Sequence, residues 1–298
     1  MHDLPLWQRR FRQALYVLLR ALGVRSVRVR VRGRPLWIDL RDKTLGRYFW
    51  VFRTYEPFEA DLLERAAESG MTAVDLGANV GYLTVLLGHR VGPAGRVLSF
   101  EPDPTNFALL RRSVEANGLA NVTCEQAAVM EKSTRAALYL SEVNFGDHRV
   151  FDGKDDERFN AGAARNRVEI RAVSLDDYLS AKGLTPALIK MDIQGAEVAA
   201  LAGMRRTLAS PDLVLFCEFW PYGLRRFGAE PRRFLDSLTE VGLTLYEIDE
   251  ESRCILPVRL EELAGRYPEH GLTNLVCCHP GREKRLLETL GLPVGRTT

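Results

Sequence analysis

VDLGANVGYLT, at positions 74–84, is the stretch that decides the fold of this chain. An apolar strand runs into Asp75, two glycines four residues apart follow, and an apolar helix begins. A chain that leaves a strand and turns at once into a helix needs residues that tolerate unusual backbone angles and let a ligand approach the backbone. Gly77 and Gly81 meet both needs. Because ligands dock at the carboxyl ends of strands in doubly wound sheets, the stretch predicts a binding turn in an α/β fold.

A second acidic residue, Glu101, lies twenty positions after Gly81 at the end of the next apolar run. A carboxylate there is placed to hydrogen-bond both hydroxyls of a ribose. The dinucleotide fingerprint needs three glycines spaced GxGxxG, whereas here Asn79 stands where a middle glycine would be needed. We therefore expect a ligand with an adenosine and no phosphates, and the spacing favours S-adenosylmethionine over a nicotinamide cofactor. A glycine-rich turn without a ligand is the alternative for the two glycines taken alone.

Strand-like and helix-like segments alternate along most of the chain. This alternation predicts a parallel-rich sheet with helices on both faces, and two late strands suit a seven-stranded sheet. Asp103 and Pro104 form a good helix start. The expected strands are 27–31 and 36–40 as a hairpin, then 73–76, 96–100, 122–126, 188–193, 213–219, 243–248 and 274–278, and the expected helices include 59–67, 82–88 and 232–240.

The first 54 residues are predicted to form a separate, basic segment. Residues 1–60 carry 13 Lys and Arg against 5 Asp and Glu, a net charge of +8, while the rest carries 28 against 34, a net charge of −6. Residues 6–22 read as an amphipathic helix that packs on its own domain or on a second subunit, or makes weak contact with a membrane surface. The overall charge of +2 gives no reason to expect a nucleic-acid partner.

The five cysteines show no CxxC spacing, and the short apolar run at 14–19 lacks a cleavage site. We read the cysteines as reduced thiols and expect a cytoplasmic protein. One interval breaks the strand–helix rhythm: 136–140 and 168–173 look like strands with a long polar loop between them. Long loops inside compact domains are usually functional or disordered, so residues 130–187 are predicted to be an inserted hairpin and substrate lid.

Taken together, the segments resemble the FkbM family of S-adenosylmethionine-dependent methyltransferases. The resemblance covers about residues 55–280, and Gln194 stands where the family often has Glu. It implies a class I, Rossmann-like, seven-stranded methyltransferase domain over residues 55–298 with an N-terminal extension over residues 1–54. The motifs that carry it are VDLGANVG (74–81), FEP (100–102), QAAV (126–129), IKMDIQGAE (189–197) and EFWP (218–221).

The resemblance implies O-methylation of a hydroxyl on a sugar, glycan or natural product. Glu101 would take the ribose hydroxyls, Gln126 and Ala127 would flank the adenine, and Asp192 would lie near the sulfonium methyl. The full set expected to bind the cofactor is Asp75, Gly77, Asn79, Gly81, Glu101, Gln126, Ala127 and Asp192.

Methyl transfer to an alcohol requires that the hydroxyl proton be removed. Three residues are candidates for this base: His148, which has a suitable intrinsic pKa, and Asp192 and Glu218, which end adjacent core strands. Lys190 and Glu197 are expected to brace the site. Phe145, Phe151, Trp220 and Tyr222 are candidates for an apolar wall, with packing as the alternative.

Asp192 and Glu218 are also of the kind that hold Mg²⁺ or Ca²⁺, but no third ligand is evident, so no metal is expected. Two other functions stay open at this point, a nucleic-acid methyltransferase and a non-catalytic module that binds S-adenosylmethionine. A nicotinamide-dependent oxidoreductase is opposed by the missing GxGxxG. The acceptor and the oligomeric state, a homo-oligomer included, are not determined by these patterns.

Overall fold

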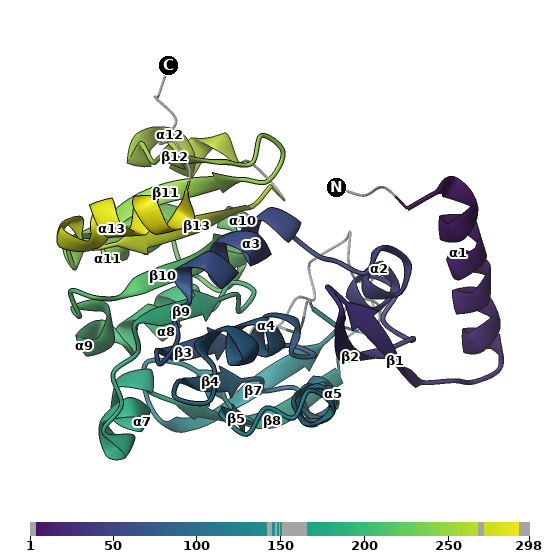
Figure 1. The fold of residues 1–298 in the computed structure, drawn as a ribbon. Coiled ribbons are helices and arrows are strands. Elements are labelled where there is room, and N and C mark those ends of the chain that lie inside the picture. Colours follow the sequence, from purple (N-terminus) through teal and green to yellow (C-terminus); the bar gives the residue numbers. More distant parts are fainter. Residues whose placement is uncertain are drawn as a thin grey trace.

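The computed structural model describes residues 4–141, 145–146, 148, 150, 166–267 and 271–291. Its centre is an eight-stranded sheet in the order β12-β11-β13-β10-β9-β3-β4-β5 (Figure 1). The strands from β10 to β5 are parallel, and β13 runs antiparallel to both β10 and β11. The bounds are β3 (Thr72–Leu76), β4 (Arg96–Phe100), β5 (Val122–Glu125), β9 (Leu188–Met191), β10 (Val214–Phe219), β11 (Thr244–Asp249), β12 (Cys254–Pro257) and β13 (Thr273–Cys278).

The class I, Rossmann-like fold is confirmed, and so is each core strand expected from the sequence. The central sheet has one strand more than the seven predicted. The eighth strand, β12, pairs antiparallel with β11 at the sheet edge after a turn in which Arg253 adopts a φ of 54°. A four-residue edge strand carries too little periodicity to stand out in a sequence.

Helices cover both faces of this sheet, because its strands present alternate side chains to opposite sides. Ala73 and Val97 face one apolar core, which contains α3 (Pro57–Ala66), α4 (Tyr82–Val91) and α13 (Pro280–Leu290). Val74 and Leu98 face the other. The helices on that second side are α8 (Glu197–Ala202), α9 (Arg205–Leu208), α10 (Pro221–Arg226), α11 (Pro231–Glu240) and α12 (Leu260–Arg266), while α7 (Leu175–Lys182) precedes β9.

The N-terminal extension consists of α1 (Leu6–Ala21), a hairpin of β1 (Ser26–Val31) and β2 (Arg34–Asp39), and α2 (Leu45–Phe52). Both the helix and the hairpin were expected, whereas α2 was not. The hairpin packs on α5 (Pro104–Ala116), which begins as predicted with the Asp103 side chain accepting from the Asn106 amide. One apolar cluster joins the extension to α4 through Tyr82 and Leu86. The boundary at residue 54 stays a prediction.

The insertion contributes β7 (Thr134–Leu140) and β8 (Asn166–Val173) to a three-stranded sheet in the order β6-β8-β7, whose third strand, β6 (Ala128–Val129), directly precedes the insertion. The predicted hairpin is therefore present, with β7 and β8 antiparallel. Residues 142–144, 147, 149 and 151–165 of the predicted lid, Phe151 among them, lie outside the described part. All five cysteines are free.

Candidate active site

The turn after β3 takes its shape from three residues in the left-handed region. Gly77, Asn79 and Gly81 have φ values of 80°, 49° and 91°. A Cβ on Gly77 would lie 1.8 Å from the backbone oxygen of Asp192, and one on Gly81 would lie 2.8 Å from a Leu110 methyl carbon. Gly77 therefore lets β3 and β9 meet closely at their carboxyl ends, a backbone contact that the sequence argument assigned to a ligand.

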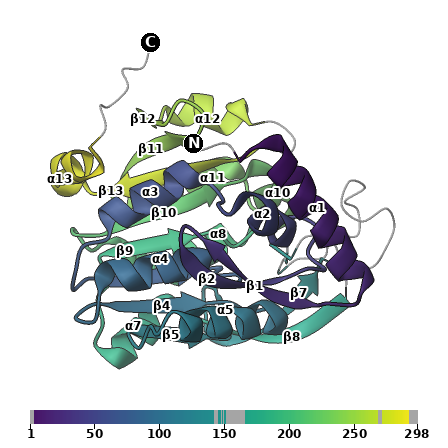
Figure 2. The same cartoon turned by 45° about the vertical axis from the view of Figure 1, so that its right-hand side comes forward.

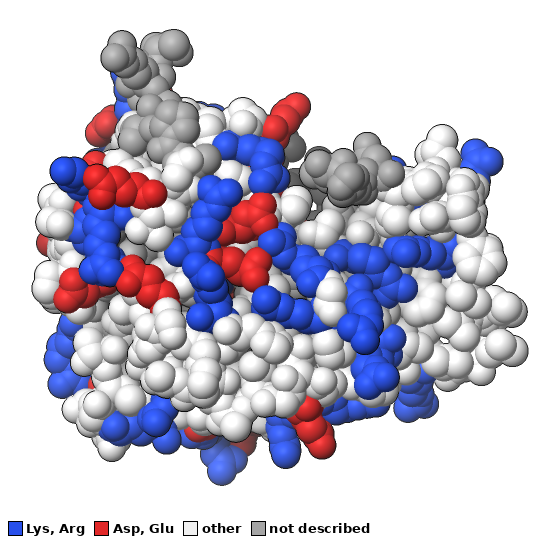
Figure 3. Space-filling model, in the orientation of Figure 1, with Lys and Arg blue, Asp and Glu red and all other residues white. Residues whose placement is uncertain are grey.

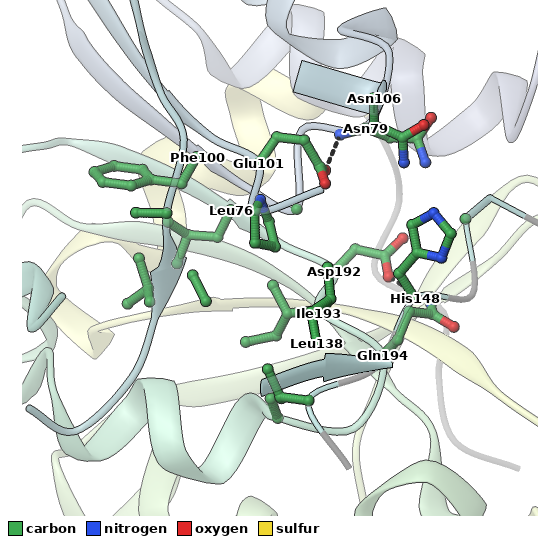
Figure 4. A pocket seen from close by; sticks show the side chains of 18 of the residues that line it. Leu76, Asn79, Phe100, Glu101, Asn106, Leu138, His148, Asp192, Ile193 and Gln194 are labelled. Atoms are coloured by element: carbon green, nitrogen blue, oxygen red, sulfur yellow. Dashed lines mark hydrogen bonds between the residues drawn. The ribbon is translucent and has the colours of Figure 1, made fainter. Parts of the chain in front are cut away.

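Glu101 directly follows β4, and its carboxylate lies beneath this turn. Its two oxygens accept hydrogen bonds from the backbone amides of Asn79, at 2.8 Å (Figure 4), and Asp103, at 2.9 Å. In its ionised form a carboxylate accepts about four hydrogen bonds, so each oxygen keeps a lone pair for a ligand hydroxyl, and hydroxyls that donate there would favour the ionised form. Burial raises the pKa of Glu101 to about 8. The side chain is thus fixed and desolvated before any ligand arrives.

A first cavity opens beside Glu101 at the carboxyl ends of β3, β4 and β9. Its empty volume, part of it open to solvent, is about 600 Å³. One part is apolar and the other polar, and in Figure 4 the carboxylate of Asp192 lies on the same side as the His148 ring. The apolar lining includes Leu76, Phe100, Ala127, Val129, Leu138 and Ile193, and the polar lining includes Asn79, Glu101, Asn106, His148, Asp192 and Gln194.

The first cavity brings together six of the residues predicted for the site: Gly77, Asn79, Glu101, Ala127, His148 and Asp192. Four others lie elsewhere. Asp75 points toward α4 and accepts from the Thr84 hydroxyl at 2.5 Å. Gly81 caps α4. Gln126 and Glu218 line neither this cavity nor the second one described below.

His148 has a defined protonation pattern in this arrangement. Its Nδ1 accepts a hydrogen bond from the Ser141 amide at 3.0 Å, so the neutral ring carries its proton on Nε2. That Nε2 lies 3.9 Å from the Asp103 carboxylate. To take a proton from a substrate, the ring would first have to release Ser141. As placed, His148 presents a donor rather than a base.

Asp192 and Glu218 are joined by the amide of Gln194. The Gln194 Nε2 donates to Asp192 Oδ1 at 2.8 Å and to Glu218 Oε2 at 3.2 Å. An ionised glutamate here could donate to neither carboxylate and a protonated one to only one of them, which gives a physical reason for Gln at this position. Burial, and then repulsion from the Asp192 charge, hold the pKa of Glu218 well above its ordinary range. Glu197 braces the turn as expected, accepting from the amides of Ile193 and Gly195.

A second cavity meets the first at three shared residues, Gly77, Asn79 and Asp192. Much of its wall is aromatic and aliphatic, from Leu45 and Phe49 of α2 and from Tyr55. The rest of its lining is Glu56, Glu59, Asp75, Ala78, Val80, Tyr82, Leu83 and Lys190.

The floor of the second cavity holds one buried ion pair, Lys190 Nζ to Glu59 Oε1 at 2.7 Å. Burial and then repulsion from Glu59 raise the pKa of Glu56 well above its ordinary range. Sequence reasoning missed this cavity, although two acids on either side of Pro57 in an apolar segment were a visible signal. Of the aromatic residues proposed as a wall, Phe145 lines the first cavity, while Trp220 and Tyr222 contact each other and line neither.

The buried carboxyls make stability depend on pH. Groups whose pKa is raised on folding bind more protons in the folded than in the unfolded chain, so stability falls as pH rises through the window between the two values. We expect the free energy of unfolding to fall by at least about 2 kcal/mol between pH 5 and pH 8, measured by urea unfolding at the two pH values. A midpoint that rises with pH would contradict this assignment. The groups that carry this dependence include Asp42 and Asp75 (pKa about 6), Glu197 (pKa about 7) and Glu101 (pKa about 8).

A sequence model of the methyltransferase FkbM domain matches residues 75–242, more than half of the chain. The chain belongs to the FkbM methyltransferase family. This FkbM methyltransferase therefore uses S-adenosylmethionine as its methyl donor. A search of curated proteins found no match. Within the described residues, no cluster of His, Cys, Asp or Glu could hold a metal ion.

Solved structures with similar folds include three whose identity to this chain is low. The FkbM methyltransferase of Methylobacillus flagellatus KT is 19% identical over 70% of this chain and 43% of its own, with a TM-score of 0.42. This chain thus spans less than half of that protein. A putative rRNA methylase from Clostridium thermocellum is 14% identical over 74% of this chain and 91% of its own (TM-score 0.43). TYW2 of M. jannaschii, in complex with AdoMet, is 12% identical over 85% and 84% (TM-score 0.40).

The first cavity fits this donor by its own chemistry. A buried carboxylate with spare lone pairs suits two ribose hydroxyls, and the apolar lining around Phe100 and Ala127 suits an adenine ring. Gly77, Asn79 and Asp192 would hold the methionine part, where an acidic side chain complements its positive charges. Gln126 does not line this cavity, and its place beside the adenine stays a prediction.

Proposed function

We propose that this FkbM methyltransferase methylates a hydroxyl group on a sugar, glycan or natural-product acceptor. The observation that carries the proposal is the meeting of two cavities at Asp192. The first cavity has the features of an adenosine site. The second has the mixture of aromatic walls and a few polar groups that suits a sugar ring or an apolar scaffold.

S-adenosylmethionine supplies a methyl group already activated by its positively charged sulfur. The protein has to hold the acceptor in line and remove its hydroxyl proton. We propose that Asp192 removes this proton, because Asp192 borders both cavities. A carboxyl with a raised pKa keeps its proton, so Glu218 leaves the negative charge of the pair on Asp192. Gln194 fixes the two side chains relative to each other.

The role of the second cavity is tested by Leu45→Ala and Tyr55→Phe. An acceptor is first found by labelled-methyl transfer over a panel of sugars, nucleotide sugars and polyketides. We expect each variant to raise KM for that acceptor by about 5- to 20-fold, the worth of one or two lost apolar or hydrogen-bond contacts. Leu272→Ala, at an exposed apolar position outside both cavities, serves as the control.

The same variants are titrated with S-adenosylhomocysteine by calorimetry. If each variant binds S-adenosylhomocysteine within about twofold of the affinity of the unmodified protein, the second cavity is supported as an acceptor site. Such a change is less than about 0.5 kcal/mol of binding free energy, which is smaller than the loss of one contact. A large loss of this affinity with an unchanged acceptor KM would instead assign the second cavity to the donor.

A further inference from the structure

Helix α1 presents an apolar face to water. Six large apolar side chains of this helix and its C-cap are exposed by 53–72% of their surface, and together they cover an arc of about 160° at 100° per residue. Figures 1 and 2 show α1 as the outermost element on one edge of the molecule. The outward face is defined by Leu6, Trp7, Phe11, Val17, Leu18 and Leu22.

The inward face of α1 carries Leu15, Tyr16 and Leu19, which pack in one apolar cluster with the hairpin and α2. Arg9 and Arg12 also contact the rest of the chain, whereas Arg10 is exposed on the outward side. Arg12 donates to the Val51 carbonyl at 2.9 Å, and its own carbonyl accepts from the Trp50 indole at 2.7 Å. The guanidinium of Arg9 lies over the Phe52 ring. Buried Tyr16 donates to the carbonyls of Leu40 and Asp42. These contacts fix the rotation of the helix, so the outward face cannot turn inward without losing them.

The segment of residues 4–55, to which α1 belongs, is basic and carries no exposed carboxylate. Among residues 4–55 the only acids are Asp39 and Asp42, and both are buried. Asp39 pairs with Arg41, and Asp42 accepts from the amides of Thr44 and Gly46. Figure 3 shows basic side chains gathered between α1 and the rest of the molecule. The exposed cations of this segment are Arg10, Arg25, Arg28, Arg30, Arg41, Lys43 and Arg47.

We propose that α1 lies flat in the interface of an anionic lipid bilayer, with its outward face among the acyl chains. A Trp- and Leu-rich face without acids, set in a cationic surround, matches apolar chains beneath anionic headgroups. A second copy of the chain fits less well, because pairing two α1 faces would bring two basic surfaces together. No helix in the described ranges is long and apolar enough to cross a membrane, and α1 has 16 residues.

The test is co-sedimentation of the whole protein with vesicles. With phosphatidylcholine containing about 30% phosphatidylglycerol, we expect at least tenfold tighter binding than with phosphatidylcholine alone. Raising the salt from about 0.1 M to about 1 M should weaken the binding severalfold, because the Debye length falls from about 10 to 3 Å. Trp7 fluorescence should shift to the blue on binding.

The combined variant Trp7→Ser, Phe11→Ser and Leu18→Ser should lose at least about tenfold in vesicle affinity, since three inserted side chains are removed. Leu272→Ser, also at an exposed apolar position but outside this segment, should bind like the unmodified protein. A thermal melt unchanged in the triple variant shows that it folds.

Three results would overturn the proposal. One is no binding of the unmodified protein to anionic vesicles at about 1 mM lipid. Another is a folded triple variant that binds as well as the unmodified protein. The third is a lipid-free dimer, detected by light scattering, that the triple variant converts to a monomer while vesicle binding is absent; this would assign the outward face to a second copy.

Discussion

Glu101→Gln should weaken the binding of S-adenosylhomocysteine by roughly 30- to 150-fold, or about 2 to 3 kcal/mol, measured by calorimetry. The carboxylate is buried and fixed by two backbone amides, so it offers its remaining lone pairs to a ribose without reorganisation. An amide replaces one acceptor oxygen with a donor, and that donor faces a backbone N–H. The variant therefore loses hydrogen bonds both to the ligand and to the backbone of the turn.

Glu115→Gln, an exposed residue of α5, makes the same chemical change away from the cavity and should leave the affinity unchanged. The thermal unfolding temperature of both variants separates lost binding from lost folding. A well-folded Glu101→Gln protein that binds S-adenosylhomocysteine normally would remove Glu101 from the donor site.

Asp192→Asn should lower turnover by about 10²- to 10⁴-fold, the usual contribution of a general base, once an acceptor is known. The asparagine oxygen still accepts hydrogen bonds, and S-adenosylhomocysteine lacks the sulfonium charge beside Asp192, so we expect its affinity to change by less than about threefold. Rates are measured at saturating donor and acceptor.

Glu218→Gln provides the matched control for this change. Gln resembles the protonated carboxyl that the raised pKa of Glu218 favours, so turnover should fall by less than about tenfold. We therefore expect Asp192→Asn to lose more turnover than Glu218→Gln. Equal losses in both variants would mean that the pair shares the proton. An active Asp192→Asn protein together with an inactive His148→Ala protein would transfer the role of base to His148.

The turn at Gly77, the core strands and Glu101 were predictable because each rests on a local pattern. Strand–turn–helix periodicity and an acid at a strand end are contained within a few residues. The donor cavity followed, since the carboxyl ends of neighbouring parallel strands meet at one edge.

The second cavity could not be predicted in the same way, because its wall is assembled from distant segments. Glu59 and Lys190 are 131 positions apart in the chain and form one buried pair. The chemistry of His148 also depended on a distant contact: the sequence indicates an imidazole near neutral pKa, but the Ser141 amide decides which nitrogen carries the proton. The rotation of α1 has the same origin, since only the contacts with Trp50 and Val51 show which of its two apolar sides faces inward.

The most direct test of the account is the chemical linkage of a transferred methyl group. The protein is incubated with methyl-labelled S-adenosylmethionine and the acceptor panel, and each labelled product is treated with alkali and analysed by mass spectrometry. We predict an alkali-stable methyl ether on a sugar or natural-product hydroxyl, formed by the unmodified protein and nearly absent with Asp192→Asn. Label found instead on nitrogen, on an alkali-labile ester or on nucleic acid would contradict the account.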